Sequence, residues 1–244
     1  MRLSRGFTRV FIFIFDNLIP PVLRDNKCFM WLSFYPLFGK KARYFMEFKE
    51  KAPFLTEEEY NDYYKFLADK HFERKTSLNT KTVKYISDNI SGGTILDIAC
   101  GGGYMVQFLA EKFPQKQIFG MDIIVPDLAN KSENLFLRAG NIENIDFPDN
   151  YFDTVICAHT LEHVQNINRA IGELRRVCRH KLIIVVPRQR EYKYTFDLHL
   201  HFFPYLFSFK KIMRNSKADY RMIANDIVYT EKVDKIPQNH SGHN

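Results

Sequence analysis

The sequence has few cysteines and no C-x-x-C pair. Its four cysteines, Cys28, Cys100, Cys157 and Cys178, are widely spaced, and two of them lie inside apolar runs. This pattern excludes a disulfide framework and is typical of reduced core residues. It therefore predicts a cytoplasmic protein.

The sequence also lacks an apolar run long enough to span a bilayer, which takes about 20 residues. The first apolar run, residues 10–15, is interrupted by Asp16 and Asn17 and then by Pro20 and Pro21. No small-residue cleavage site follows an apolar core. We therefore expect neither a transmembrane segment nor a secretory signal peptide.

Internal repeats and low-complexity blocks are absent as well. With 244 residues, of which 45% are hydrophobic and 26% charged, the chain is long enough to bury one sizeable core. We expect one main domain with an appendage. The net charge of +7 favours an anionic partner where that charge is clustered.

Much of the positive charge lies near the N-terminus, beside two aromatic-rich runs at 10–15 and 28–38. The basic residues are Arg2, Arg5, Arg9, Lys40, Lys41 and Arg43. Two compatible interpretations stay open for this extension, residues 1–50. Either its aromatic side chains enter an anionic membrane surface at the inner face, or they pack as a cap on the main domain.

Two helices are predicted next, and together they suggest a helical cap over 51–92. The first covers the segment 52–75, where Thr56 and Glu59 form a capping box. The second covers 80–90 and ends at a pair of glycines. The polar tail, 235–244, is expected to be disordered.

From residue 93 to 234, short β-rich runs alternate with helical patterns, which is typical of a doubly wound, mostly parallel α/β sheet. The predicted strands are 94–98, 117–121, 135–139, 152–158 and 181–186. Helices are predicted at 104–112 and 167–178, and one or two antiparallel edge strands within 220–233. For 123–134 we expect a short helix or an irregular loop.

A glycine-rich turn follows the first predicted strand, in ILDIACGGG (95–103). Glycines allow a tight turn and a close approach to a ligand, and the helix that follows offers unbonded N–H groups at its start. Asp97 precedes the glycines, and Asp122 ends the next strand, where an acid accepts hydrogen bonds from ribose hydroxyls. No G-x-G-x-x-G is present, which disfavours a nicotinamide cofactor.

Residues 94–187 resemble the class I S-adenosylmethionine-dependent methyltransferases, in particular the branch of ubiquinone-type and related small-molecule O-methyltransferases. The resemblance depends on the order of ILDIACGGG, FGMD, GNIENIDFPDNYFDTVICAHTLEHV and KLIIVVP. It implies a Rossmann-like fold and S-adenosylmethionine as cofactor. The implied cofactor residues are Asp97, Ala99, Gly101, Gly103, Asp122, Ile123, Asn141, Ile142 and His159.

Within that resemblance, the first motif holds the methionine end of the cofactor, Asp122 the ribose, and Asn141 with Ile142 the adenine. Two positions depart from the family pattern. Ala99 replaces a more common glycine, and Asn141 replaces a frequent aspartate, although its carbonyl oxygen can still accept a hydrogen bond.

Histidines follow the fourth and fifth predicted strands, where ligands bind in open α/β sheets. The candidates for a general base are His159, His163, His199 and His201. If 195–203 is extended, Asp197, His199 and His201 share one face and line an acceptor pocket. No third metal ligand is evident beside His159 and His163, so we expect no metal.

The sequence thus predicts methyl transfer to a hydroxyl of a small-molecule, sugar- or lipid-linked acceptor. Two alternatives stay open: an RNA methyltransferase, and a scaffold that binds the cofactor without catalysis. Nucleic acid is disfavoured as a partner, because the predicted catalytic part has no dense basic stripe.

Overall fold

The computed structural model describes residues 13–15, 17–68, 76, 78–128, 132–194 and 196–233. The predictions for Arg2, Arg5, Arg9, the end of the helix predicted at 52–75, and the tail 235–244 lie outside these residues. No helix in the described part combines the length and hydropathy needed to cross a membrane.

A seven-stranded sheet forms the centre of the fold, in the order β3-β2-β1-β4-β5-β7-β6. Five strands are parallel: β1 (Thr94–Ile98), β2 (Gln117–Asp122), β3 (Leu135–Ala139), β4 (Phe152–Ala158) and β5 (Cys178–Pro187). Two are antiparallel additions, β6 (Asp219–Ile223) and β7 (Asp226–Lys232). The predicted parallel strands are confirmed. Of the two antiparallel strands, β6 lies at an edge of the sheet, while β7 pairs with both β5 and β6.

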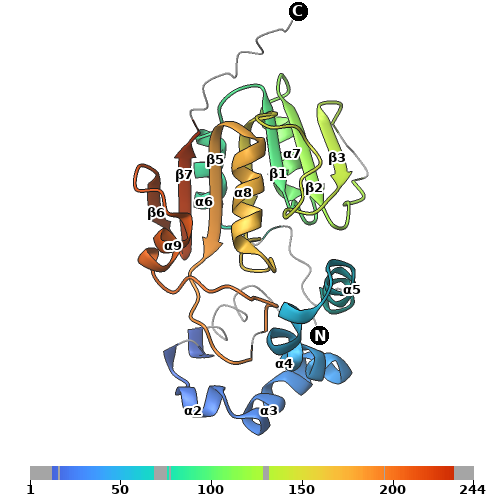
Figure 1. Cartoon of the computed structure of the whole chain (residues 1–244), viewed down its shortest axis with the longest axis vertical. Coiled ribbons are helices and arrows are strands. Elements are labelled where there is room, and N and C mark those ends of the chain that lie inside the picture. Colours follow the sequence, from blue (N-terminus) through green and yellow to red (C-terminus); the bar gives the residue numbers. More distant parts are fainter. Residues whose placement is uncertain are drawn as a thin grey trace, which may run out of the picture.

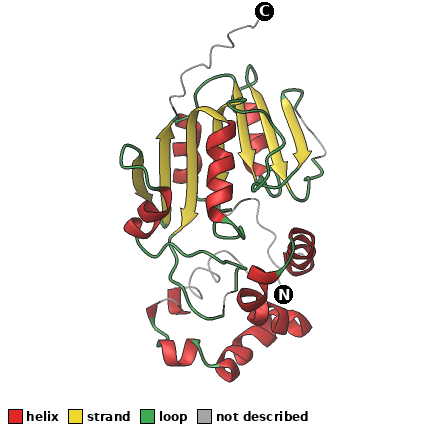
Figure 2. Cartoon of the chain, in the orientation of Figure 1, coloured by secondary structure: helices red, strands yellow, loops and turns green. Residues whose placement is uncertain are grey.

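Helices cover both faces of the sheet, so the predicted doubly wound architecture is confirmed (Figures 1 and 2). On one face α8 (Ile167–Val177) and α9 (Leu206–Met213) pack against alternate residues of β5, including Leu182 and Ile184. On the other, α6 (Thr80–Asp88) and α7 (Tyr104–Lys112) pack against Ile183 and Val185. The central strands are therefore apolar on both sides, as buried parallel strands are.

The parallel strands point toward a separate group of helices (Figure 1). This group comprises α2 (Pro21–Arg24), α3 (Lys27–Phe38), η1 (Gly39–Lys41), α4 (Ala42–Lys51), η2 (Ala52–Phe54) and α5 (Glu57–Ala68). Helix α4 continues past residue 50, where the sequence suggested a division. The capping box at the start of α5 is present, since Glu59 Oε2 accepts from the Thr56 backbone N–H at 2.8 Å.

Aromatic side chains of these helices form a second core with the segment that follows β5. Phe34 stacks on Phe196 at 4.1 Å between ring centroids, and Phe38 stacks on Phe45 at 3.9 Å. Tyr192 and Tyr194 are buried in the same cluster. The extension therefore packs on the rest of the chain, as the cap interpretation predicted.

Between β2 and β3 the described residues form no helix, in agreement with the irregular loop that we considered for 123–134. Its three residues 129–131 lie outside the described part.

Candidate functional site

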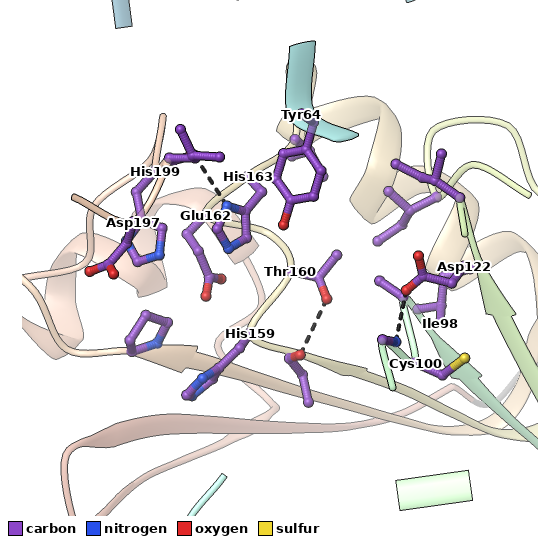
Figure 3. A pocket seen from close by; sticks show the side chains of 18 of the residues that line it. Tyr64, Ile98, Cys100, Asp122, His159, Thr160, Glu162, His163, Asp197 and His199 are labelled. Carbon is purple, nitrogen blue, oxygen red and sulfur yellow. Dashed lines mark hydrogen bonds between the residues drawn. The ribbon is translucent and has the colours of Figure 1, made fainter. Parts of the chain in front are cut away.

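One cavity of about 600 Å³ lies at the carboxyl edge of the parallel strands, between the sheet and helix α5. The ends of β1, β2 and β4 line it, together with the segment after β5. Figure 3 shows Asp122, Cys100 and Ile98 on one side of this cavity and Glu162, His163 and His199 on the other. Tyr64 enters from α5 between the two groups.

The glycine-rich turn between β1 and α7 is built from left-handed residues. Ala99, Gly101 and Gly103 have φ of 57°, 53° and 78°. Ala99 is tolerated there at a cost in strain, which is common at binding sites. Gly103 is the N-cap of α7, and a Cβ there would approach the Leu128 side chain to 3.1 Å. Gly101 lines the cavity, whereas Gly103 serves the helix and is not one of the lining residues.

Asp122 ties this turn to β2. Its Oδ2 accepts from the Gly101 backbone N–H at 2.8 Å, and its Oδ1 accepts from the Ile124 N–H at 3.1 Å. The carboxylate is thereby fixed at the cavity wall, beside Ile123. Carboxylate oxygens have further lone pairs, so Asp122 can still accept from the hydroxyls of a ribose.

Asp97 lies at the base of the same end and is 3% exposed. Burial, and then the nearby charge of Asp122, raise the pKa of Asp97 to about 8. A buried carboxyl of this kind ionises readily only when a cation sits beside it. It is therefore suited to the ammonium group of an amino-acid ligand.

Asn141 and Ile142 line the cavity near the first turn of α5. The Asn141 amide donates to Glu57 Oε1 at 2.5 Å, and Asn141 Oδ1 accepts from the Glu143 N–H at 2.9 Å. Helix α5 thus contacts the loop that the resemblance assigns to adenine. The sequence offered no signal for this contact, which depends on tertiary packing.

Two histidines meet at the other end of the cavity. The rings of His163 and His199 are 4.7 Å apart between centroids and cross at 77°. Burial, and then the neighbouring histidines, lower the pKa of both rings to about 3. Both imidazoles are therefore neutral at pH 7.

Glu162, which was not predicted as a site residue, joins these histidines. Its side chain is buried, with the residue only 1% exposed, and burial raises its pKa to about 7. Its presence in the run LEHV, beside His163, was the available signal. The segment after β5 is held against it, because the Leu200 and His201 N–H groups both donate to the Glu162 carbonyl oxygen, at 2.7 and 3.0 Å.

His159 follows β4 and also lines the cavity. Its Nε2 lies 3.1 Å from Asp226 Oδ1, and Asp226 Oδ2 accepts from the Thr82 hydroxyl at 2.8 Å. The backbone of His159 is left-handed, with φ of 53°. A carboxylate that is itself held in place thus orients this imidazole.

The prediction that Asp197, His199 and His201 share one face of an extended segment is wrong. Leu198 has φ of 55°, which turns the chain between them. His201 is not among the residues that line the cavity, and its Nε2 lies 2.9 Å from the Val164 carbonyl oxygen. Asp197 and His199 do line it.

The chain is similar to known proteins in sequence and in fold. A family model described as "Methyltransferase domain" matches residues 96–186. The chain is 34% identical over 90 residues to a demethylmenaquinone methyltransferase of Thermus thermophilus, covering 34% of this chain and 41% of that protein. It is 28% identical over 128 residues to an uncharacterized methyltransferase of Schizosaccharomyces pombe, covering 46% and 45%. It spans less than half the length of these relatives.

Among solved structures, the fold resembles a putative methyltransferase in complex with the Haloferax volcanii Trm112 methyltransferase activator. The TM-score is 0.51 at 12% identity, covering 72% of this chain and 95% of that one. A Pyrococcus horikoshii protein gives a TM-score of 0.50 at 17% identity, covering 64% and 89%. At such identities the likeness concerns the fold, and the family assignment depends on the sequence match. Residues 96–186 are thus a methyltransferase domain of the class I type, which uses S-adenosylmethionine.

Proposed function

We propose that this protein transfers the methyl group of S-adenosylmethionine to a hydroxyl oxygen of a small-molecule, sugar- or lipid-linked acceptor. The observation that carries the proposal is that one cavity is lined both by most of the predicted cofactor residues and by a group of histidines. The demethylmenaquinone methyltransferase named above supports a small molecule as acceptor.

The reaction is an in-line displacement at the methyl carbon. The acceptor oxygen loses its proton and forms a bond to carbon, while the carbon–sulfur bond breaks and its electron pair stays on sulfur. The positively charged sulfonium becomes the neutral thioether of S-adenosylhomocysteine. The protein's main contribution is to hold the oxygen, carbon and sulfur in line.

Of the histidines considered as general base, His159 is the best suited. A useful base has a pKa near the working pH, whereas the pKa values of His163 and His199 are lowered to about 3. His159 instead has a carboxylate partner in Asp226, whose Oδ1 lies 3.1 Å from its Nε2 and orients the ring. His201 is not among the residues that line the cavity.

The first prediction concerns Asp122. Asp122→Ala removes the acceptor of the ribose hydroxyls and the bond to the Gly101 N–H, and should weaken S-adenosylmethionine binding by about 1.5–3 kcal/mol. Titration calorimetry measures this change. The exposed neighbour Asp127 is the control, because Asp127→Ala should bind as the wild type does. Equal affinity in the two variants would remove Asp122 from the cofactor site.

The second prediction concerns Asp97. Since its pKa is about 8 in the free protein, binding of the cofactor ammonium should expel most of one proton at pH 7 and little at pH 9. Calorimetry in two buffers with different ionisation enthalpies measures the proton release. Asp97→Asn should release none and bind at least about tenfold more weakly.

The same shift has a consequence for stability. The unfolded chain ionises Asp97 near its usual pKa, while the folded protein holds the proton up to about pH 8. This group's contribution to stability is therefore complete below about pH 4 and is lost as the pH rises to 8. Without cofactor at pH 8, Asp97→Asn should melt above the wild type. A lower melting temperature would contradict the assignment.

The third prediction concerns the base. His159→Gln keeps a hydrogen-bonding side chain but no useful basicity, and should lower turnover about a hundredfold or more with cofactor affinity nearly unchanged. Acceptors can be sought by transfer of radiolabelled methyl groups into lipid and sugar extracts. Asp226→Asn should lower turnover less, because the imidazole remains. Unchanged turnover in His159→Gln would exclude His159 as the general base.

An anionic membrane surface is a second partner that we propose, through helices α2 and α3. Val22 is 75% exposed and Leu32 74%, while Trp31 and Tyr35 stack at 5.6 Å between ring centroids on the same stretch of chain. Exposed apolar side chains beside a basic one, here the exposed Lys27, suit an interfacial segment. This arrangement supports a lipid-linked acceptor, and it is compatible with the cap, whose other side chains face inward.

The fourth prediction tests this surface on the full chain. Binding to vesicles should rise with the fraction of anionic lipid and fall with salt, because salt screens the attraction between charges. The double variant Val22→Glu, Leu32→Glu should bind at least about fivefold more weakly. Phe207→Glu, at a residue of α9 that is 58% exposed, is the matched control. Equal co-sedimentation of all three proteins would contradict the membrane proposal.

A further inference from the structure

We propose that Glu162, His163 and His199 bind one divalent transition-metal cation at the acceptor end of the cavity. We further infer that this cation binds the acceptor oxygen, an inference that rests on the proposed function. The sequence alone predicted no metal, because no third ligand is evident beside His159 and His163 in the chain.

The three side chains lie close enough together to share one cation. Glu162, His163 and His199 each offer one ligand atom, and these atoms lie within 4.8 Å of one another. Glu162 and His163 follow β4, while His199 comes from the segment after β5. That segment is fixed by the two backbone hydrogen bonds to the Glu162 carbonyl oxygen. Small side-chain movements would bring the three atoms to a shared cation.

The two imidazoles are oriented as metal ligands are. His163 Nδ1 lies 3.1 Å from the Leu198 carbonyl oxygen, and His199 Nδ1 lies 2.6 Å from Gln189 Oε1. Both partners are acceptors, so each Nδ1 carries the proton and each Nε2 carries the lone pair. Metal-binding histidines are held in this way, with the second nitrogen donating to a carbonyl or carboxylate.

The Glu162 carboxylate beside the two histidines has an oxygen that lacks a partner. Glu162 Oε2 is buried and has no hydrogen-bond partner among the described residues. An isolated polar oxygen in this position is costly, and an ionised one more so. A cation bound there would satisfy it, which the neutral histidines alone do not.

The donor set defines the class of cation. Two imidazoles and one carboxylate suit Zn²⁺, Co²⁺, Mn²⁺ or Fe²⁺, whereas Mg²⁺ and Ca²⁺ prefer oxygen ligands throughout. Three protein ligands leave at least one coordination position for another molecule. The same cavity continues from these residues to Asp122 and the glycine-rich turn, where the cofactor is expected.

At that open position the cation would act on the acceptor hydroxyl. Coordination of the oxygen lowers the pKa of its proton, which passes to His159 or to solvent. The metal-bound oxygen then forms the new bond to the methyl carbon as the carbon–sulfur bond breaks. The cation is unchanged at the end, and one proton is released for each methyl group transferred.

The test uses Co²⁺ as the probe on the full chain after chelator treatment. We expect one equivalent to bind, with visible absorption bands from the bound ion and a rise in melting temperature. Glu162→Gln and His199→Gln should each weaken Co²⁺ binding at least about tenfold. His180→Gln is the matched control, since His180 lies on β5 with a side chain that is 57% exposed, and it should bind as the wild type does.

Binding of S-adenosylhomocysteine, measured separately, distinguishes the two proposals. If S-adenosylhomocysteine binds and Co²⁺ does not, the metal site is wrong and the proposed function stands. If Co²⁺ binds and S-adenosylhomocysteine does not, the proposed function fails and the site stands. Co²⁺ binding that survives in Glu162→Gln would also overturn the site. Melting curves without metal establish whether each variant is folded. If Glu162→Gln or His199→Gln is not folded, the other of these two variants provides the test.

Discussion

The constraint on which this protein depends is the burial of its parallel strands on both faces. Strands β1, β4 and β5 are covered by helices on each side, so their central runs, 95–96, 155–157 and 182–186, are apolar. Polar side chains of these strands therefore lie mainly at the strand ends. Because parallel strands end at one edge, Asp97, Asp122, His159 and Glu162 gather around a single cavity.

Much of this could be predicted from the sequence, since it depends on local patterns. The helix at Tyr104–Lys112 and four of the five parallel strands begin where the apolar runs begin, because burial on both faces leaves the strands little choice of residue. Asp122 was predicted for the same reason: a polar residue that ends a buried strand must lie at its edge. Its bond to the Gly101 N–H then fixes a turn that contains left-handed residues.

What could not be predicted depends on segments that meet only in three dimensions. Glu162 and His199 become neighbours through backbone hydrogen bonds between two loops, and a repeating pattern in the sequence cannot predict such bonds. His201 was misplaced because its N–H and its ring bond to the loop after β4, at the Glu162 and Val164 carbonyl oxygens, and not to the cavity. Tyr64 and Glu57 also line the cavity. They do so because aromatic side chains pack α4, α5 and the segment after β5 together, which the sequence alone does not indicate.

Helix α5 has a further consequence for how the cavity exchanges its contents. It contacts both ends of the cavity: Glu57 bonds to Asn141, which we predict to border the adenine, and the Tyr60 hydroxyl donates to the His163 carbonyl oxygen beside the histidines. A displacement of this one helix would loosen both ends together. Under the proposed function, arrival of the acceptor and departure of the spent nucleoside would then be mechanically linked, and the two ends of the cavity would open and close as a unit.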